Sequence, residues 1–319
     1  MRPSRSSLAL CVMVIAACEA EPQPSSGPRQ LAGTLGVEGA DLFYQAVGEG
    51  EPLVVVHGGP GLDHSYLRPW LDSLAAGRRV IYYDQRGLGR SAARVDSAGI
   101  SMSRWLTDID RVRERVARRE RVAILAHSWG AIPALLYAIE APERVDRLVL
   151  VSPVEPGADY QEETNARQAA RRDSADARAI DSIGRSEAFA AGDRDAFNRL
   201  FTHVFRGTFA DPARADSLLD LNLEDRTARQ GRRVSMLLMG PLRGLDFWDE
   251  LTSIQVPVLI VHGAADPIPV PMVRRLEESL PRGRLVVLED VGHFPFIESP
   301  ARFRSAVEGF LAEGSPAAP

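Results

Sequence analysis

The stretch that most constrains this chain is residues 122–139, where an apolar run leads into a serine between small residues and then into a helical pattern. Residues 122–125 are Val-Ala-Ile-Leu, residues 126–130 are Ala-His-Ser-Trp-Gly, and residues 134–139 are again mostly apolar. A strand, a sharp turn with a central serine, and a helix form a nucleophile elbow, in which a crowded backbone favours small flanking residues. Ala126 stands where this pattern usually has glycine. Five residues fit an ordinary strand-to-helix loop equally well, so the rest of the chain must distinguish the two interpretations.

Further apolar runs predict a sheet buried on both faces. They span residues 52–56, 79–83, 148–151, 258–261 and 285–288. Continuous apolar runs are typical of such strands, and strands that alternate with helices predict a mostly parallel sheet covered on both sides. The predicted fold class is therefore α/β. In such sheets ligands bind at the carboxyl ends of the strands, where the glycine-rich and polar loops of this sequence fall.

Three other segments have clear local patterns. Residues 31–47 contain two short apolar-rich segments with a break between them and predict an antiparallel hairpin. Residues 103–120 are rich in arginine and acidic residues. They predict a helix whose charged face is exposed to solvent and forms ion pairs between residues four positions apart. Residues 301–311 predict a closing amphipathic helix.

The character of the chain changes after residue 153. Residues 154–245 are polar, lack strong strand patterns, and show helical patterns at 195–204 and 213–221, so they predict an inserted helical segment. The predicted division is a core of residues 31–153 and 246–313, a helical insertion at 154–245 and a disordered tail at 314–319.

The N-terminal residues resemble a bacterial export signal. Two arginines precede a short apolar stretch at residues 8–17, which cannot span a bilayer because that takes about 20 residues. The stretch ends Ile-Ala-Ala before Cys18, which resembles a lipobox, so we expect residues 1–17 to be removed and Cys18 to carry the lipid anchor. The alternative is an ordinary signal peptide with an incidental cysteine. Residues 18–30 are rich in Pro, Ser and Gly and predict a flexible tether, so the sequence predicts an exported lipoprotein on the periplasmic or cell-surface side of a membrane.

Charge and motif content limit the partners. The net charge of −5 argues against a nucleic-acid partner. Residues 57–61, His-Gly-Gly-Pro-Gly, could cradle a phosphate, but neither G-K-[ST] nor G-x-G-x-x-G follows them. We therefore expect a small molecule or a short peptide as substrate, without a cofactor or a metal ion.

A nucleophilic Ser128 would need a base within hydrogen-bonding reach and an acid that orients the base. For a serine in an elbow, the acid and then the histidine follow later in the chain. Of the six histidines, only His293 lies in a loop after a late strand, so we predict that it is the base. Asp266 lies in the loop after the first strand beyond the insertion and is the predicted acid. The alternatives are a surface histidine, an Asp-Pro turn at Asp266, and Glu289 or Asp290 as the acid.

Negative charge that develops on a substrate carbonyl oxygen must be met by fixed hydrogen-bond donors. The backbone N–H of Trp129, directly after the serine, is one predicted donor. The second should come from the loop at residues 57–61, whose glycines let the backbone approach closely, and we assign it to the N–H of Gly59.

Three stretches together resemble the proline iminopeptidase-like branch of the α/β-hydrolase superfamily. They are HGGPG at residues 57–61, DQRGLGRS at 84–91 and Ala-His-Ser-Trp-Gly at 126–130. With Asp266 and His293, the resemblance covers nearly all of residues 35–312. It implies an α/β-hydrolase fold with an eight-stranded, mostly parallel sheet flanked by helices, and with the insertion as a helical cap over the active site.

The resemblance also implies a serine hydrolase that forms an acyl-enzyme on Ser128, and most directly an aminopeptidase that releases N-terminal proline from small peptides. In that branch, acidic residues in or near the cap bind the free amine of the substrate. Glu224, beside a leucine-rich stretch late in the insertion, is the candidate here. The alternative is that it is a solvated helix residue, as are the other acidic residues of the insertion, Glu155, Glu162, Glu163 and Glu187.

Other functions remain open at this point. The same triad serves esterases, amidases and cofactor-free haloperoxidase-like activity, whereas relatives with a carboxylate nucleophile are excluded because residue 128 is serine. A function of another class is a surface-anchored, non-catalytic binding protein that keeps the fold. Such a protein would be expected to have lost the serine, the histidine or the glycine-rich loop, and all of these are present.

Overall fold

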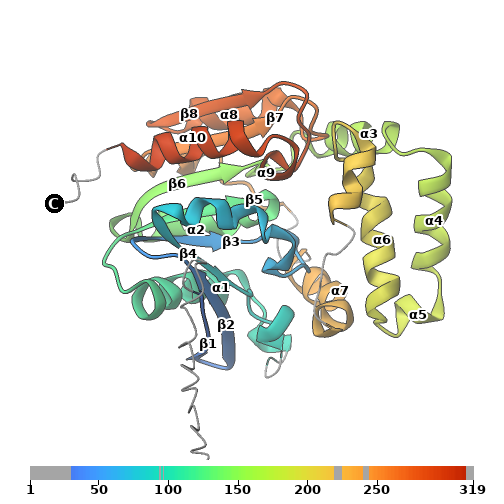
Figure 1. Cartoon of the computed structure of the whole chain (residues 1–319), viewed down its shortest axis with the longest axis horizontal. Helices are drawn as coiled ribbons and strands as arrows, with labels where there is room; N and C mark the ends of the chain where they lie inside the picture. The colour runs from blue at the N-terminus through green and yellow to red at the C-terminus, as the bar shows by residue number, and fades with distance from the viewer. Residues whose placement is uncertain (1–29, 93–94, 96, 219–224, 240–243, 314–319) are drawn as a thin grey trace, which may run out of the picture.

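The computed structural model describes residues 30–92, 95, 97–218, 225–239 and 244–313, and its centre is one eight-stranded sheet (Figure 1). The strands are β1 (Gln30–Val37), β2 (Ala40–Val47), β3 (Glu51–Val56), β4 (Arg78–Tyr83), β5 (Val122–His127), β6 (Val145–Val151), β7 (Val258–Gly263) and β8 (Gly283–Leu288). The predicted mostly parallel eight-stranded sheet flanked by helices is confirmed. The predictions for residues 1–17, Cys18, Glu224 and residues 314–319 lie outside the described residues.

The strands follow the order β1-β2-β4-β3-β5-β6-β7-β8. β1 pairs with β2 in antiparallel fashion, as predicted for the hairpin; β2 also pairs with β4 in antiparallel fashion, and the strands from β4 to β8 are parallel to their neighbours. Gln30, predicted to end the tether, is the first residue of β1 and pairs with Val47, which pairs with Val80 near the start of β4. β1 therefore begins at the end of the sheet where the parallel strands also begin.

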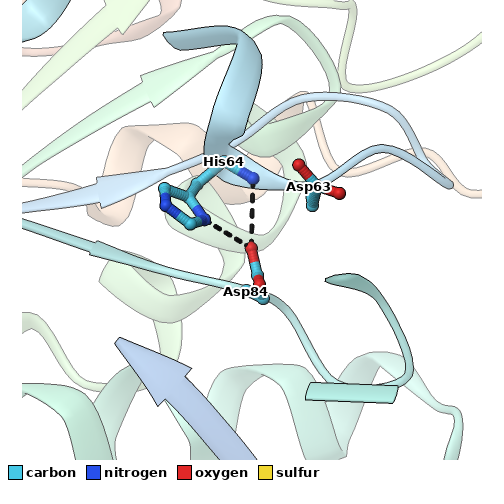
Figure 2. Close-up of side chains that lie close together, drawn as sticks. All are labelled: Asp63, His64 and Asp84. Atoms are coloured by element: carbon cyan, nitrogen blue, oxygen red, sulfur yellow. Dashed lines mark hydrogen bonds and ion pairs between the residues drawn. The ribbon is translucent and has the colours of Figure 1, made fainter. Parts of the chain in front are cut away.

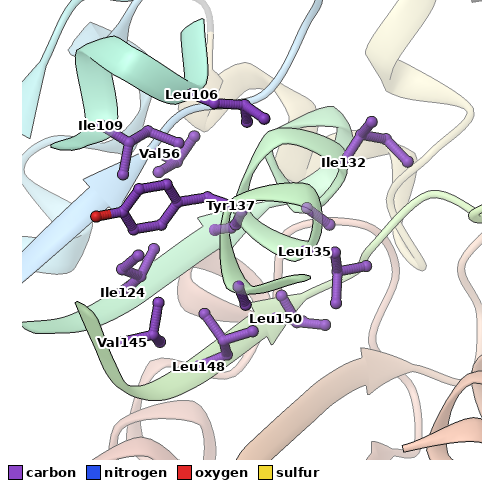
Figure 3. Close-up of a cluster of buried hydrophobic side chains, with 14 of the residues drawn as sticks. Val56, Leu106, Ile109, Ile124, Ile132, Leu135, Tyr137, Val145, Leu148 and Leu150 are labelled. Atoms are coloured by element: carbon purple, nitrogen blue, oxygen red, sulfur yellow. The ribbon is translucent and has the colours of Figure 1, made fainter. Parts of the chain in front are cut away.

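Side chains of the central strands alternate between two apolar cores, one on each face of the sheet. In β3, Leu53 and Val55 belong to one core, and Val54 and Val56 belong to the other. The face of Val56 is covered by α1 (Met102–Arg111), α2 (Ala131–Glu140) and α8 (Val270–Ser279), and the opposite face by η2 (Trp70–Ala76) and α10 (Pro300–Ala312). Figure 3 shows the first of these cores, which gathers side chains of α1, α2 and the central strands. Each fully buried Val, Leu or Ile contributes roughly 1.5–3 kcal/mol to stability, so the two cores fix the sheet that carries the loops.

The helix predicted for residues 103–120 is shorter than expected. α1 ends at Arg111, and a π-helical stretch, Val112–Ala117, follows it. Arg118 then stops the helix with a φ of 56°, in the left-handed conformation that usually falls to glycine. Because the sequence has arginine rather than glycine at this position, the end of the helix carries no local signal.

Helices inserted between β6 and β7 lie beyond the end of the sheet toward which the parallel strands point (Figure 1). In the described part of the chain they are α3 (Gln161–Ala170), α4 (Ser174–Gly184), α5 (Glu187–Ala190), α6 (Arg194–Arg206) and α7 (Asp225–Met239), with the 3₁₀ segment η8 (Pro212–Leu218), and a further 3₁₀ segment, η9 (Asp249–Ser253), leads into β7. The helical pattern at 195–204 corresponds to α6, whereas the pattern at 213–221 corresponds to η8 and to residues outside the described ones. Across the ranges that the structure covers, no helix is long and apolar enough to cross a membrane.

The inserted helices are held by caps and by a buried carboxylate. Asp173, Ser186 and Asp193 each accept hydrogen bonds from backbone N–H groups in the first turn of the helix that follows, which begins α4, α5 and α6. Asp176 of α4 is 3% exposed and lies 2.7 Å from Nδ1 of His203 in α6. His203, a histidine that the sequence placed in the insertion, therefore has a structural partner within it.

Two glycines form the contact between α7 and the loop that follows β3. A Cβ on Gly61 would lie 2.7 Å from the carbonyl oxygen of Gly231, and a Cβ on Gly231 would collide with the carbonyl oxygen of Gly61. Gly61 also has a φ of 110°, which favours glycine. Since both obstacles are backbone atoms that cannot rotate away, a side chain at either position would push α7 from the loop.

Gly231→Ala is expected to destabilise the protein by about 1–3 kcal/mol, because the added methyl group overpacks this contact. Gly309→Ala in α10 is the matched control, since a Cβ there meets nothing within 4 Å. We expect the control to stabilise by roughly 0.5–1 kcal/mol, as alanine does for glycine inside a helix. Urea unfolding of the two variants measures the difference, and equal stabilisation by both would contradict the contact between α7 and the loop.

Candidate active site

Ser128 follows β5 directly, in a turn that only small neighbours permit. Its φ of 54° lies in the left-handed region, which a non-glycine residue adopts under constraint. A 3₁₀ turn, Ser128–Gly130, continues into α2. A Cβ on Gly130 would lie 2.5 Å from the carbonyl oxygen of Val56, so glycine is required there. Ala126 is buried in the apolar core, which accommodates its methyl group in place of the usual glycine.

The structure brings together the three side chains predicted as a triad. Nε2 of His293 lies 2.9 Å from Oγ of Ser128, and Nδ1 of His293 lies 2.8 Å from Oδ2 of Asp266. Asp266 follows β7, His293 follows β8 and Ser128 follows β5, so all three stand at the same end of the sheet. Asp266 is 1% exposed and His293 is 9% exposed. A hydroxyl that faces an imidazole held by a buried carboxylate can be activated as a nucleophile.

Asp266 is placed to remain ionised. Burial alone would raise its pKa, but the electrostatic influence of the neighbouring His293 and His262 imidazoles and the hydrogen bonds from His293 and Ile268 lower the pKa below its usual value. The N–H of Ile268 donates to Oδ1 at 2.9 Å, so Oδ2 is the atom that faces His293. The carboxylate therefore accepts the Nδ1 proton of His293, and the lone pair on Nε2 faces Ser128.

His262 lies beside this pair, within β7. Its Nδ1 is 3.8 Å from Oδ2 of Asp266, and its Nε2 donates to the carbonyl oxygen of Ile268 at 2.9 Å. Burial lowers the pKa of His262, so the imidazole is neutral near pH 7. His293 rather than His262 is thus the histidine whose ring lies within hydrogen-bonding distance of Ser128.

The loop at residues 57–61 lies against the serine. A Cβ on Gly58 would lie 3.2 Å from Cβ of Ser128. The N–H of Gly58 donates to the hydroxyl of Tyr66 at 2.7 Å, and the N–H of the next residue, Gly59, is the donor assigned from the sequence. Gly59 has a φ of 139°, a conformation that favours glycine. The N–H of Trp129, the other predicted donor, is the first amide after Ser128 in the elbow turn.

The residues at 84–91 brace the neighbouring loops. Gln85 donates from its backbone N–H to Nε2 of His57 at 3.1 Å and from its side chain to the carbonyl oxygen of His57 at 2.7 Å. Arg86 forms a buried, two-pronged ion pair with Asp108, at 2.6 and 2.9 Å. Gln85 therefore ties this motif to the loop after β3, whereas Arg86 ties it to α1.

Asp63, His64 and Asp84 form a buried cluster whose composition would suit a metal ion (Figure 2). Oδ1 of Asp84 accepts hydrogen bonds from both the backbone N–H and Nδ1 of His64, at 3.1 and 2.6 Å, and Oδ2 accepts from the N–H of Arg90. Burial alone would lower the pKa of His64, but the charge of Asp84 raises it above its usual value. Asp84 therefore has protein donors at both carboxylate oxygens, and Oδ1 of Asp63 accepts from the backbone N–H and the hydroxyl of Ser65.

The inserted helices contact the loops of the acid and the base. Arg167 of α3 donates to the carbonyl oxygen of Asp266 at 3.2 Å, and Arg171 donates to the carbonyl oxygen of Ala265. The backbone N–H of His293 donates to the carbonyl oxygen of Thr208 at 2.9 Å. The insertion thus places basic side chains on the backbone of the Asp266 loop and also helps to fix the backbone of His293.

The acidic residues considered for amine binding are placed differently. Glu224 lies outside the described residues. Glu155 is partly buried and accepts a hydrogen bond from the N–H of Tyr160 at 2.8 Å, and burial raises its pKa. Glu162, Glu163 and Glu187 are exposed, in agreement with their alternative interpretation as solvated helix residues.

Glu298 is a site residue that the sequence did not reveal. Its carboxylate accepts hydrogen bonds from the N–H groups of Gly292 and Phe294, on either side of His293, at 3.0 and 3.1 Å. It also accepts from the N–H of Ala210 in the insertion, at 2.8 Å. Burial raises the pKa of Glu298. Its partner at Ala210 is 88 residues away, so no local pattern could have identified it.

Comparisons with known proteins agree with this geometry. The α/β hydrolase fold family matches residues 51–300. The chain is 26% identical to the proline iminopeptidase of Lactobacillus delbrueckii subsp. bulgaricus over 289 residues, 84% of this chain and 93% of that protein. It is also 26% identical to the proline iminopeptidase of Clostridioides difficile over 290 residues, 88% of this chain and 97% of that protein.

Solved structures show the same fold. A proline iminopeptidase-related protein of Thermus thermophilus superposes with a TM-score of 0.66 at 26% identity, over 89% of this chain and 98% of that one. An esterase of Exiguobacterium antarcticum superposes with a TM-score of 0.64 at 23% identity, over 86% and 97% of the two chains. Because the family match extends over most of the chain and the sheet has the corresponding architecture, the chain belongs to the α/β hydrolase fold family.

Proposed function

We propose that the protein is a serine hydrolase in which Ser128 is the nucleophile, His293 the base and Asp266 the residue that orients the base. The observation that carries this proposal is the continuous pair of hydrogen bonds from Ser128 through His293 to Asp266, at 2.9 and 2.8 Å. The serine, the histidine, the aspartate and the glycine-rich loop are all present, so a non-catalytic binding protein is the weaker hypothesis.

In the proposed reaction, Oγ of Ser128 attacks the substrate carbonyl carbon while Nε2 of His293 takes the hydroxyl proton. The charge on the carbonyl oxygen is met by the N–H groups of Gly59 and Trp129, and removing one such donor costs about 3–4 kcal/mol of transition-state stabilisation. His293 then gives its proton to the leaving group, which departs and leaves an acyl group on Ser128. A water molecule, deprotonated by His293, attacks this ester, and the proton returns to Ser128 as the acid product leaves.

A fluorophosphonate probe tests the proposal directly. The purified protein should react with one equivalent, lose activity in parallel, and yield an adduct that mass spectrometry locates on the peptide containing Ser128. Pre-treatment with a denaturant should prevent labelling, because the reaction depends on the assembled triad. A folded protein that is not labelled at Ser128 would rule out the serine hydrolase.

For the substrate, we propose short peptides with a free N-terminal proline, supported by the similarity to proline iminopeptidases. A second candidate is an ester or amide without a free amine. It is supported by Arg167, which donates to the carbonyl oxygen of Asp266, because a cation beside the triad disfavours a positively charged substrate group.

A small substrate panel separates the two candidates. Prolyl and alanyl naphthylamides carry a free amine, N-acetyl-prolyl naphthylamide is blocked, and p-nitrophenyl esters of short acids have no amine. An aminopeptidase should cleave the prolyl substrate and leave the blocked one intact. Turnover confined to the blocked amide or the esters would exclude the aminopeptidase and support the second candidate.

We also propose that the protein is exported and held at a membrane by lipid on Cys18, which lies outside the described residues. The supporting pattern is the short apolar stretch that ends Ile-Ala-Ala before this cysteine. In a bacterial host, Cys18→Ser should move the protein from the membrane fraction to the soluble fraction. Membrane association that persists in this variant would exclude the lipid anchor.

A further inference from the structure

Two buried side chains beside the triad take no part in the proposed reaction, yet they form a chain of hydrogen bonds across the site. The N–H of Gly58 donates to Oη of Tyr66 at 2.7 Å, and Oη of Tyr66 lies 2.7 Å from Nδ1 of His127. Nε2 of His127 lies 3.0 Å from the carbonyl oxygen of His293. Tyr66 is 3% exposed and His127 is 2% exposed. One end of this chain is therefore the loop of the proposed oxyanion donor, and the other end is the proposed base.

The protons of this chain have one consistent arrangement. The N–H of Gly58 can only donate, so Tyr66 accepts there and gives its own proton to Nδ1 of His127. The carbonyl oxygen of His293 can only accept, so Nε2 of His127 carries a proton. Burial lowers the pKa of His127 to about 3 and raises the pKa of Tyr66, so both groups stay neutral near pH 7. Every donor in the chain then faces an acceptor.

Aromatic rings fix the orientation of His127. The centroids of Phe294, Phe296 and Tyr66 lie 5.4, 5.2 and 5.6 Å from the centroid of its imidazole. These contacts limit rotation of the ring about its side-chain bonds, and such packing keeps both ring nitrogens aimed at their partners. Because the imidazole of His127 has little freedom to rotate, the hydrogen bonds on its two ring nitrogens keep a fixed geometry.

We propose that Tyr66 and His127, together called the Tyr66–His127 relay, are positioning residues that hold Gly58 and His293 at a fixed separation around Ser128. The proposal rests on the proposed function, because it takes His293 as the base and the loop of Gly58 as the source of the oxyanion donor. Both must be aligned with the same substrate carbonyl in the transition state, and a misplacement of about 1 Å can cost about 10²-fold in rate. The relay therefore acts on kcat rather than on KM.

Tyr66→Phe tests the relay with the loss of one oxygen atom. It leaves the N–H of Gly58 without its acceptor and Nδ1 of His127 without its donor. We expect kcat to fall by about 10- to 100-fold, with KM changed less than about twofold. Tyr82→Phe is the matched control, because Tyr82 is equally buried and donates to Asp72 at 2.8 Å, away from the triad. Tyr66→Phe removes two hydrogen bonds of a buried hydroxyl and Tyr82→Phe removes one, so thermal unfolding should show a loss of stability in both variants, while only Tyr66→Phe slows turnover.

Two variants of His127 separate positioning from packing. His127→Leu removes both hydrogen bonds and should lower kcat as Tyr66→Phe does. His127→Gln places an amide N–H where Nε2 lies, so it can still donate to the carbonyl oxygen of His293 and should restore most of the rate lost in the leucine variant. The double variant with Tyr66→Phe and His127→Leu should lose little more than either single variant, because residues that act as one unit are not additive.

The outcomes distinguish this inference from the proposed function. If fluorophosphonate labels Ser128 in the unmodified protein but Tyr66→Phe and His127→Leu stay within twofold of its kcat, the relay is excluded and the serine hydrolase stands. Equal slowing by Tyr82→Phe, or the absence of rescue by His127→Gln, would also overturn the relay. If the unmodified protein is not labelled, the proposed serine hydrolase function is excluded, and the positioning role of the relay is excluded with it.

Discussion

Replacing Ser128 with alanine is expected to lower kcat by about 10⁶-fold, with little change in KM, because the alanine variant has no nucleophile to form the acyl-enzyme. Oγ of Ser128 is the atom that faces Nε2 of His293 at 2.9 Å, so its removal also leaves the base without a proton to take. The remaining rate would come from Gly59, Trp129 and substrate binding. Steady-state kinetics on the best substrate of the panel, with active-site titration to exclude contaminating enzyme, measures the loss.

Ser152→Ala is the matched control for this variant. Ser152 follows β6, the strand next to β5, and like Ser128 it is a serine with a positive φ, here of 46°, although Ser152 is fully buried and Ser128 is partly exposed. The two substitutions therefore impose the same chemical change in similar backbone surroundings, and Ser152→Ala should keep activity within a few-fold. Comparable turnover by the Ser128 variant and the unmodified protein would disprove the assigned nucleophile.

Asp266→Asn is expected to lower kcat by about 10⁴-fold while the fold stays intact. The carboxylate has two acceptor oxygens, one for the N–H of Ile268 and one for Nδ1 of His293. An asparagine has only one oxygen to offer. If that oxygen keeps its bond to Ile268, the amide group donates to Nδ1 and forces the proton of His293 onto Nε2, where it blocks transfer from Ser128. If the amide group is flipped, its N–H groups face the N–H of Ile268, and this backbone donor loses its acceptor.

The control for this prediction is Asp290→Asn, the same change at an acid that the sequence alone left as an alternative. Asp290 is exposed, and its φ of 59° is one that asparagine also adopts readily. Its activity should match that of the unmodified protein. A kcat/KM profile against pH, together with thermal unfolding, checks that Asp266→Asn acts on the base. A loss shared by both variants would show that Asp266 has no special role.

The sheet and the three-residue constellation could be predicted from the sequence because both have local signals. Continuous apolar runs mark strands that are buried on both faces, and Leu53 and Val54 do face two different cores. The order serine, aspartate, histidine follows from the positions of the loops at strand ends, and these loops meet at one edge of a parallel sheet. Spacing along the chain therefore translates into closeness in space for Ser128, Asp266 and His293.

Other parts of the site depend on contacts that no local pattern records. Tyr66 meets His127 across 61 residues, and Glu298 reaches Ala210 across 88. The end of the helix before β5 was predicted too late because Arg118 adopts a conformation that glycine usually marks. For the insertion, the sequence pointed to acidic residues, whereas the described side chains that hydrogen-bond to the loop of Asp266 include Arg167 of α3 and Arg171 directly after it. Helix patterns show which residues are exposed but not which helix faces the catalytic loops.

The position at which the chain joins the sheet has a practical consequence for immobilisation. Gln30 pairs with Val47, which lies level with Val80 at the starting end of the parallel strands, whereas Ser128 comes after the far end of β5. Five or six residues of strand, or roughly 15–20 Å, therefore separate the two ends. A resin, electrode or carrier protein coupled ahead of Gln30 would attach to the back of the molecule. The end of the sheet that carries Ser128 would then face away from the support, which makes N-terminal coupling the preferred route for immobilising this protein.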